Sequence, residues 1–184
     1  MTMERIGAAG AAITRAAGET DPAQFEALAQ AIAAAGRIVL HGAGREGLMM
    51  RALAMRLHHL GLAAHVWGDM AMPPVGPGDL VLLSAGPGDL ATVEVLARLA
   101  AGAGARSACV TAQPQGPTPR ACDQVLAIPA QTMADDRGAD AALLPMGSVF
   151  EGAMFLVFEM LVLRLADLLG EGPETIRARH ANLE

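Results

Sequence analysis

The stretch Arg37–Leu60, RIVLHGAGREGLMMRALAMRLHHL, decides which fold this sequence predicts. Its apolar first residues, 37–41, predict a short strand, and the glycines that follow predict a tight turn into a helix. The apolar residues of that helix recur at spacings of three and four: Met50, Leu53, Ala54, Leu57 and Leu60. A glycine turn between a strand and a helix directs backbone N–H groups and the positive helix end towards one point. We therefore expect a polar or anionic ligand to bind at this turn.

Outward from this stretch, apolar runs alternate with segments that favour helices. Further strands are expected at residues 63–67, 80–84, 106–111 and 124–128, and helices at 3–17, 22–35, 90–101, 148–169 and from 173 towards 180. Residues 113–119 are expected to form a proline-broken loop, and residues 129–147 an irregular connection. Strands that are apolar throughout and alternate with helices predict an α/β protein with a parallel sheet covered on both faces. Ligands of such sheets bind beyond the carboxyl ends of the strands.

The length of the chain favours one domain with a full core. It would span residues 1–184, with N-terminal helices at 1–36, a sheet core at 37–147 and C-terminal helices at 148–184. Hydrophobic residues make up 53% of the chain, and residues 149–169 are nearly all apolar. Because charged residues still interrupt that segment, it is expected to be a buried helix rather than a membrane span. Part of it would be buried between subunits, which predicts a dimer or tetramer.

The charge and composition exclude several classes of partner. A net charge of −6 gives no electrostatic attraction for nucleic acid or an anionic membrane, and an aromatic content of 3% leaves few platforms for base stacking. Cys109 and Cys122 match neither a disulfide framework nor a metal-ligand spacing. The first residues show no basic region followed by an apolar run. We therefore expect a cytoplasmic protein that binds neither nucleic acid nor membrane.

One interpretation of the glycine turn is a dinucleotide site. Residues 42–47, GAGREG, satisfy the pattern G-x-G-x-x-G between a strand and a helix. Asp69 follows the second strand, roughly 20 residues later, where a ribose-binding acid would lie. However, two helices precede the first strand, and the sheet is too small for two mononucleotide-binding halves. Glu46 would also place a negative charge beside the pyrophosphate, so an NAD-binding oxidoreductase is the weaker interpretation.

Four further stretches carry a more specific pattern. They are residues 54–61 (AMRLHHLG), residues 67–69 (WGD) with Pro73, residues 144–151 (LPMGSVFE) and residues 179–184 (RHANLE). In this order and spacing they resemble the sugar isomerase (SIS) domain family, and within it the phosphohexuloisomerase branch. The resemblance implies a three-layer α/β/α sandwich with a five-stranded parallel sheet of flavodoxin-like order, assembled as tetramers. It also implies interconversion of isomeric ketose phosphates without a metal or a nucleotide, so we expect no cofactor and a small sugar or sugar phosphate as ligand.

The candidate substrate-binding residues lie in the loops after the first three strands. They are Gly44, Arg45, Glu46, Gly47, Asp69, Ala85, Gly86, Gly88 and Asp89. The family reads G-R-S-G and S-G-S-G-x-T where this chain has GREG at 44–47 and AGPGDL at 85–90. The phosphate-holding hydroxyls are missing, and two added carboxylates would oppose a phosphate by several kcal/mol at an effective dielectric constant of about 20. We therefore expect a substrate that lacks phosphate or carries it elsewhere.

Glu151 is the first candidate catalytic residue. Moving a carbonyl along a sugar needs a base that lifts a proton from one carbon and returns it to the next. A carboxylate at a helix start beside Phe150 and Met154 can have a raised pKa that suits this task. The alternative is a capping box, because Ser148-x-x-Glu151 fits S-x-x-E. The match to the family's Phe-Glu pair favours catalysis.

His180 is the second candidate catalytic residue. The resemblance implies that this histidine opens the sugar ring or shuttles protons in a neighbouring subunit's site. The alternative is a solvated histidine near the chain end. Simpler alternatives also exist for the binding residues: Arg45 in a surface ion pair with Glu46 or Asp69, Glu46 as a complement to the helix dipole, and Asp89 as a helix cap.

Three functions are therefore compatible with the sequence. The first is a metal-free sugar isomerase that works through an enediol. The second is an SIS module that binds a sugar derivative without turnover, and the third is the oxidoreductase described above. Because Glu151 and His180 are both present, the first is the preferred hypothesis.

Overall fold

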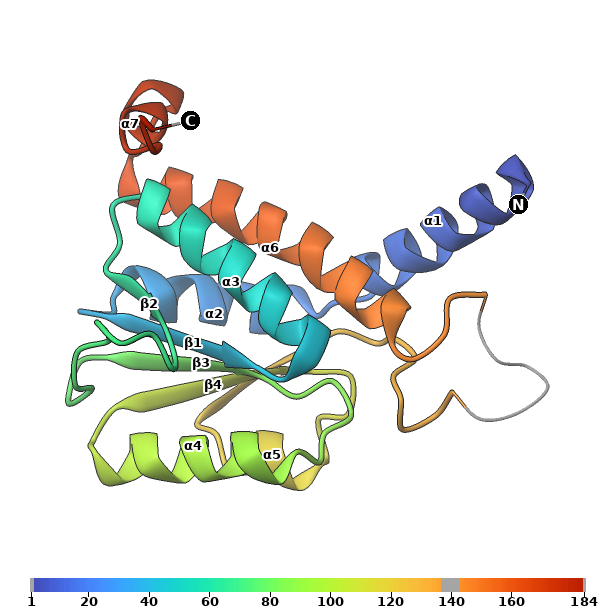
Figure 1. Cartoon of the computed structure of the whole chain (residues 1–184), viewed down its shortest axis with the longest axis horizontal. Helices are drawn as coiled ribbons and strands as arrows, with labels where there is room; N and C mark the ends of the chain where they lie inside the picture. The colour runs from blue at the N-terminus through green and yellow to red at the C-terminus, as the bar shows by residue number, and fades with distance from the viewer. Residues whose placement is uncertain (1, 137–142, 184) are drawn as a thin grey trace.

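The computed structural model describes residues 2–136 and 143–183 of the chain (Figure 1). Its elements in chain order are α1 (Met3–Gly18), α2 (Pro22–Ala33), β1 (Ile38–Gly42), α3 (Gly44–His59), β2 (Ala64–Val66), β3 (Leu80–Ser84), α4 (Ala91–Gly102), β4 (Arg106–Thr111), α5 (Pro117–Arg120), β5 (Gln124–Ala127), α6 (Ser148–Leu169) and α7 (Pro173–Ala178). Residues 137–142, within the expected irregular connection, and Glu184, the last residue of the family string, lie outside the described residues.

The five strands form one parallel sheet in the order β2-β1-β3-β4-β5. This confirms the predicted five-stranded parallel sheet, and it is the flavodoxin-like order, in which the chain reverses direction across the sheet between β1 and β3. Gly42 at the end of β1 pairs with Ser84 at the end of β3. The loops that follow these strands are therefore neighbours. The strand order differs from that of the dinucleotide-binding fold, which opposes the oxidoreductase interpretation.

Each face of the sheet carries alternate side chains of the same strands. Ile38 and Leu40 of β1 belong to a core cluster with residues of α2, α3 and α6, whereas Val39 belongs to a cluster with residues of α4. Figure 1 shows α3 and α6 on one side of the sheet and α4 with α5 on the other. The structure is thus the predicted three-layer α/β/α sandwich.

Local sequence signals account for several helix ends. The Asp21 carboxylate accepts the N–H groups of Ala23 and Gln24 at the start of α2, at 2.7 and 3.1 Å. Gly61, with a φ of +82°, follows the end of α3 in the left-handed region that favours glycine.

The loop expected at residues 113–119 is partly wrong, because residues 117–120 form the short helix α5. Proline is compatible with the first helical position, where Pro117 lies. The Thr118 side chain then ties α5 to the chain before α4, because its hydroxyl oxygen accepts the Leu90 N–H at 3.0 Å.

The longest helix, α6, has the predicted bounds and packs against α1, α2 and α3. A Cβ atom on Gly152 would lie 2.7 Å from Cδ1 of Ile13, so this glycine allows α1 to approach α6 closely. In the part of the chain that the structure describes, no helix combines the length and apolar character that crossing a membrane requires.

Because β1 and α3 approach each other closely at Gly47, we expect even a small side chain there to lower the stability of the fold. A Cβ atom on Gly47 would lie 2.5 Å from the backbone oxygen of Gly42, which cannot move away as a flexible side chain can. We expect Gly47→Ala to lower the free energy of unfolding by about 1–3 kcal/mol, the usual cost of overpacking. Gly10→Ala in α1 is the matched control, because nothing lies within 4 Å of its Cβ position, and it should add about 0.5–1 kcal/mol. Urea unfolding would measure both, and equal stability of the two variants would contradict the prediction.

Candidate active site

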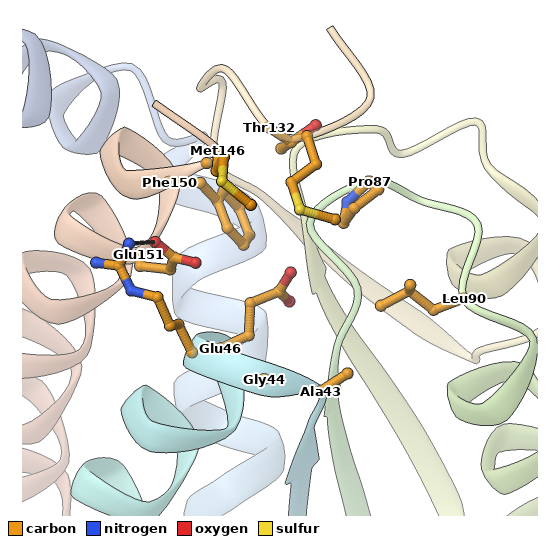
Figure 2. A pocket seen from close by; sticks show the side chains of 12 residues that line it. Ala43, Gly44, Glu46, Pro87, Leu90, Thr132, Met146, Phe150 and Glu151 are labelled. Atoms are coloured by element: carbon orange, nitrogen blue, oxygen red, sulfur yellow. Dashed lines mark ion pairs between the residues drawn. The ribbon is translucent and has the colours of Figure 1, made fainter. Parts of the chain in front are cut away.

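A pocket of about 410 Å³ opens where the loops after β1 and β3 meet the start of α6 (Figure 2). Its lining residues are Ala43, Gly44, Arg45, Glu46, Pro87, Leu90, Thr132, Met133, Met146, Gly147, Phe150 and Glu151. The wall is largely apolar, with two carboxylates and one guanidinium among these side chains. The pocket lies beyond the carboxyl ends of the strands at the reversal between β1 and β3, where the topology predicts a ligand site.

Glu46 lies in the first turn of α3 and is buried, with 9% of its surface exposed. Its carboxylate accepts the N–H of Gly86, at 3.0 and 3.2 Å to the two oxygens, and a short hydrogen bond from the Ser84 hydroxyl. Glu46 therefore does more than complement the helix dipole, because it connects α3 to the loop after β3. Ser84 is not among the residues predicted from the sequence, although a polar residue that ends an apolar strand was a usable signal.

Glu151 lies in the first turn of α6 and is also buried. Its Oε2 atom is 3.3 Å from Nη1 of Arg45, and it accepts no hydrogen bond from the described residues. Arg45 Nη1 also donates to Oγ of Ser148 at 2.7 Å. The expectation that Arg45 pairs with Glu46 or Asp69 is therefore wrong, since its ion pair is with Glu151.

The alternative interpretation of Ser148-x-x-Glu151 as a capping box is also wrong. Gly147, with a φ of +83°, is the N-cap of α6, and no side chain caps this helix. The Ser148 hydroxyl instead donates to the backbone oxygen of Pro145 at 2.8 Å. The Glu151 carboxylate is consequently left facing the pocket (Figure 2).

Burial sets the proton affinity of both carboxyl groups. Burial raises the pKa of Glu46 above its usual 4.5; the hydrogen bonds from Ser84 and Gly86 oppose this shift, and the charge of Glu151 adds to it. Burial likewise raises the pKa of Glu151, while the charge of Arg45 opposes that shift. A carboxylate with a raised pKa is a stronger base than an exposed one, so Glu151 suits proton abstraction.

Three of the nine predicted substrate-binding residues belong to the lining of this pocket. Gly44, Arg45 and Glu46 line it, Gly47 packs behind them, and Ala85, Gly86 and Gly88 form the buried part of the facing loop. Among the described residues, no group of three His, Cys, Asp or Glu side chains is placed to hold a metal ion. Sequence reasoning missed Pro87, Leu90, Thr132, Met133 and Met146 as lining residues. For Thr132 and Met133 no sequence signal was available, because only the folded chain brings them to this pocket.

Asp69 and Asp89 are not among the residues that line this pocket. Oδ1 of Asp69 is 3.5 Å from Nη1 of Arg51, and both side chains are more than half exposed. Asp89 is exposed, and the expectation that it caps the next helix is wrong, because Leu90 is the N-cap of α4 and makes no side-chain cap bond.

His180 lies at the opposite end of α3 from the pocket. Its ring centroid is 5.2 Å from that of His59, the last residue of α3, whereas Glu46 lies in the first turn of that helix. Thirteen residues of helix separate the two positions, which corresponds to about 20 Å. Figure 1 shows α7 beside this far end of α3. His180 therefore does not reach the pocket of its own chain, and Arg179 holds it there by donating to the His59 backbone oxygen at 3.0 Å.

The fold and the pocket identify the class of this protein. The chain belongs to the SIS domain family, whose model, described as "SIS domain", matches residues 31–162. This match extends from the last residues of α2 into α6 and contains both pocket carboxylates.

The relatives within this class are more specific. The chain is 40% identical to a 3-hexulose-6-phosphate isomerase from Mycobacterium gastri, over 91% of this chain and 84% of the relative. It is 33% identical to a protein of the same name from Bacillus subtilis, over 88% and 87%. A crystal structure from Methanococcus jannaschii, described as inferring a 3-hexulose-6-phosphate isomerase function, has a TM-score of 0.85 and 23% identity. It covers 99% of this chain and 100% of the other, and at this identity it supports the fold alone.

The raised pKa of Glu46 predicts how stability depends on pH. Folding favours the protonated form of this group, so its contribution is complete below the unfolded pKa of about 4.5 and is lost as the pH rises through the folded pKa. Glu46→Gln lacks this loss, so we expect its stability to improve relative to wild type as the pH rises above about 5. Urea unfolding across this range would measure the difference.

The matched control for this measurement is Glu26→Gln. The hydrogen bonds from Arg164 hold the pKa of Glu26 at about 2, so its difference from wild type should stay constant above about pH 5. A Glu46→Gln difference that is equally constant, or that shrinks as the pH rises, would show that burial does not penalise the Glu46 charge.

Proposed function

We propose that this protein is a sugar isomerase that moves a carbonyl between neighbouring carbons of a ketose through an enediol. The relatives named 3-hexulose-6-phosphate isomerase, which match most of the chain, support the reaction class and imply a sugar-phosphate type of substrate. The observation that carries the proposal is the buried Glu151 carboxylate, whose Oε2 accepts no hydrogen bond from the described residues and faces the pocket. A group with this geometry is available to take a proton from substrate.

The reaction needs one base and a means of moving a hydroxyl proton. Glu151 removes the proton from the carbon beside the carbonyl, the electron pair forms the enediol double bond, and a general acid, the role proposed for the partner subunit's His180, gives a proton to the carbonyl oxygen. Glu151 then returns its proton to the former carbonyl carbon, while the neighbouring hydroxyl gives its proton back to the same group and becomes the new carbonyl. Arg45 keeps Glu151 ionised before the first step, because its charge favours the carboxylate.

Glu151→Gln tests the proposed base. We expect kcat to fall by about two to four orders of magnitude, the usual contribution of a positioned acid or base. The fold should persist, since glutamine has the same shape and Glu151 makes no cap bond. Glu159→Gln is the matched control: it lies on the same helix, outside the pocket lining, and pairs with Arg56 at 2.8 Å. Ketose isomerisation would be assayed with and without a 6-phosphate. Equal turnover by both variants would show that Glu151 is not the base, and no turnover by the wild-type protein would leave it a binding module.

We also propose that the protein works as a dimer or tetramer, in which His180 completes the site of a neighbouring subunit. Two observations support this proposal. His180 lies at the far end of α3 from its own pocket. Large apolar side chains of α3 and α6 are also more than half exposed: Leu48, Met55, Phe155, Met160 and Leu163. A cytoplasmic setting is compatible with the free thiols of Cys109 and Cys122.

Subunit mixing distinguishes a shared site from an independent one. Glu151→Gln and His180→Gln should each be nearly inactive alone, and co-expression of the two should restore activity. In a mixed oligomer, one site keeps its own Glu151 and receives an intact His180 from the other chain. Light scattering would verify the assembly. Mixtures as inactive as the parents, or a monomeric wild-type protein, would contradict the role proposed for His180.

A further inference from the structure

The loop at residues 85–90 has the location of an anion-binding loop, between the end of β3 and the start of α4. Three of its backbone N–H groups already donate to protein oxygens, at 2.9 or 3.0 Å: Ala85 to Val110, Gly88 to Ala85, and Leu90 to the Thr118 hydroxyl. Pro87 has no N–H to offer. Of the two remaining N–H groups, that of Asp89 belongs to an exposed residue that carries its own carboxylate, so the Gly86 N–H is the buried donor that this loop would offer an anion.

The Gly86 N–H is occupied by the chain itself. Both oxygens of Glu46 accept it, at 3.0 and 3.2 Å, and the Ser84 hydroxyl donates to the same carboxylate. A phosphate is recognised by the same kinds of donor, backbone N–H groups and hydroxyls. The Glu46 carboxylate thus makes the contacts that a substrate phosphate would make at this loop.

The space beside Gly86 is also filled. A Cβ atom on Gly86 would lie 2.8 Å from Cδ1 of Phe150 and 2.9 Å from Oε1 of Glu46. Two side chains therefore pack directly against this glycine. A phosphate oxygen can reach the Gly86 N–H only if Glu46 leaves, which would expose a buried carboxylate and break its bond with Ser84.

The charges of the pocket also oppose the binding of a phosphate. Arg45 is the cation among the lining residues that the structure describes, and it is already paired with Glu151 at 3.3 Å. A phosphate dianion would meet two carboxylates and no unpaired cation among these residues. Figure 2 shows Glu46 and Glu151 on one side of the pocket, with Pro87 and Leu90 opposite.

We propose that Glu46 determines substrate specificity by taking the place of a substrate phosphate, so that the sugar presents an uncharged, hydroxyl-bearing end to this loop. The inference rests on the proposed isomerase function and names its substrate class, a ketose without phosphate at this end, which departs from the sugar phosphate that the relatives' names imply. An ionised carboxylate has about four acceptor sites, so Glu46 keeps capacity for a sugar hydroxyl beside its bonds to Ser84 and Gly86.

Calorimetry with D-fructose, D-fructose 6-phosphate and inorganic phosphate tests this proposal. Wild-type protein should bind fructose more tightly than fructose 6-phosphate, and inorganic phosphate should not displace fructose. Glu46→Ser frees the Gly86 N–H and removes the charge, so it should bind fructose 6-phosphate at least about tenfold more tightly than wild type does. Inorganic phosphate should then compete.

Two further variants separate occupancy from charge. Glu46→Gln removes the charge but keeps an acceptor over the Gly86 N–H, so its gain in fructose 6-phosphate affinity should be smaller than that of Glu46→Ser. Glu94→Ser in α4 removes a carboxylate that is absent from the pocket lining, and should leave all three affinities unchanged. A folded Glu46→Ser that gains no affinity for phosphate would overturn the proposal.

The wild-type measurement decides the question even if Glu46→Ser fails to fold. Preference of wild type for fructose 6-phosphate, with competition by inorganic phosphate, would show that the loop accepts phosphate despite Glu46. The failure of the proposed function looks different: fructose would bind with the expected preference, but no ketose would be isomerised.

Discussion

The carboxylate of Glu46 connects the two loops that form the pocket. Glu46 belongs to α3, whereas its donors, Ser84 and Gly86, belong to the end of β3 and the loop after it. These segments meet because β1 and β3 pair in register, with Gly42 opposite Ser84. Burying a carboxylate without donors is costly, so the contact ties the position of α3 to the shape of the loop. The positive end of α3 adds a favourable interaction with the same charge.

This contact depends on backbone positions that have no side chain. Gly47 approaches the Gly42 oxygen, which sets how α3 leaves β1 and therefore where Glu46 points. Phe150 and Glu46 pack against Gly86 more closely than a Cβ atom at this position would allow. Because Phe150 precedes Glu151 in α6, the packing at Gly86 also fixes the second carboxylate. The chemistry of the pocket thus follows from close backbone approach rather than from the loop side chains that the family motif emphasises.

The sequence predicted the regular elements well where their signal is local. The bounds of β3, β4 and α6 agree with the prediction, because each is a continuous apolar or helix-favouring run bounded by turn residues. The short helix α5 was missed because prolines at 117 and 119 indicate a loop, although proline fits a first helical turn. Its partner, Leu90, lies 28 residues away from Thr118. No local pattern carries that contact.

In the site, as in the fold, local motifs predicted some features, whereas contacts between residues distant in the sequence determined others. The motif S-x-x-E predicted a cap at Ser148, but Arg45, 103 residues earlier in the chain, donates to the Ser148 oxygen. Glu46 and Asp89 had the same interpretation, an acid beside a phosphate loop, yet one is buried against Gly86 and the other is exposed. The sequence shows that both side chains are acidic, but it does not show which way each carboxylate points. The pairing of β1 with β3 sets that direction. An inward acid replaces an anion, whereas an outward acid only repels one through solvent, and this difference makes Glu46 the residue on which the substrate's charge depends.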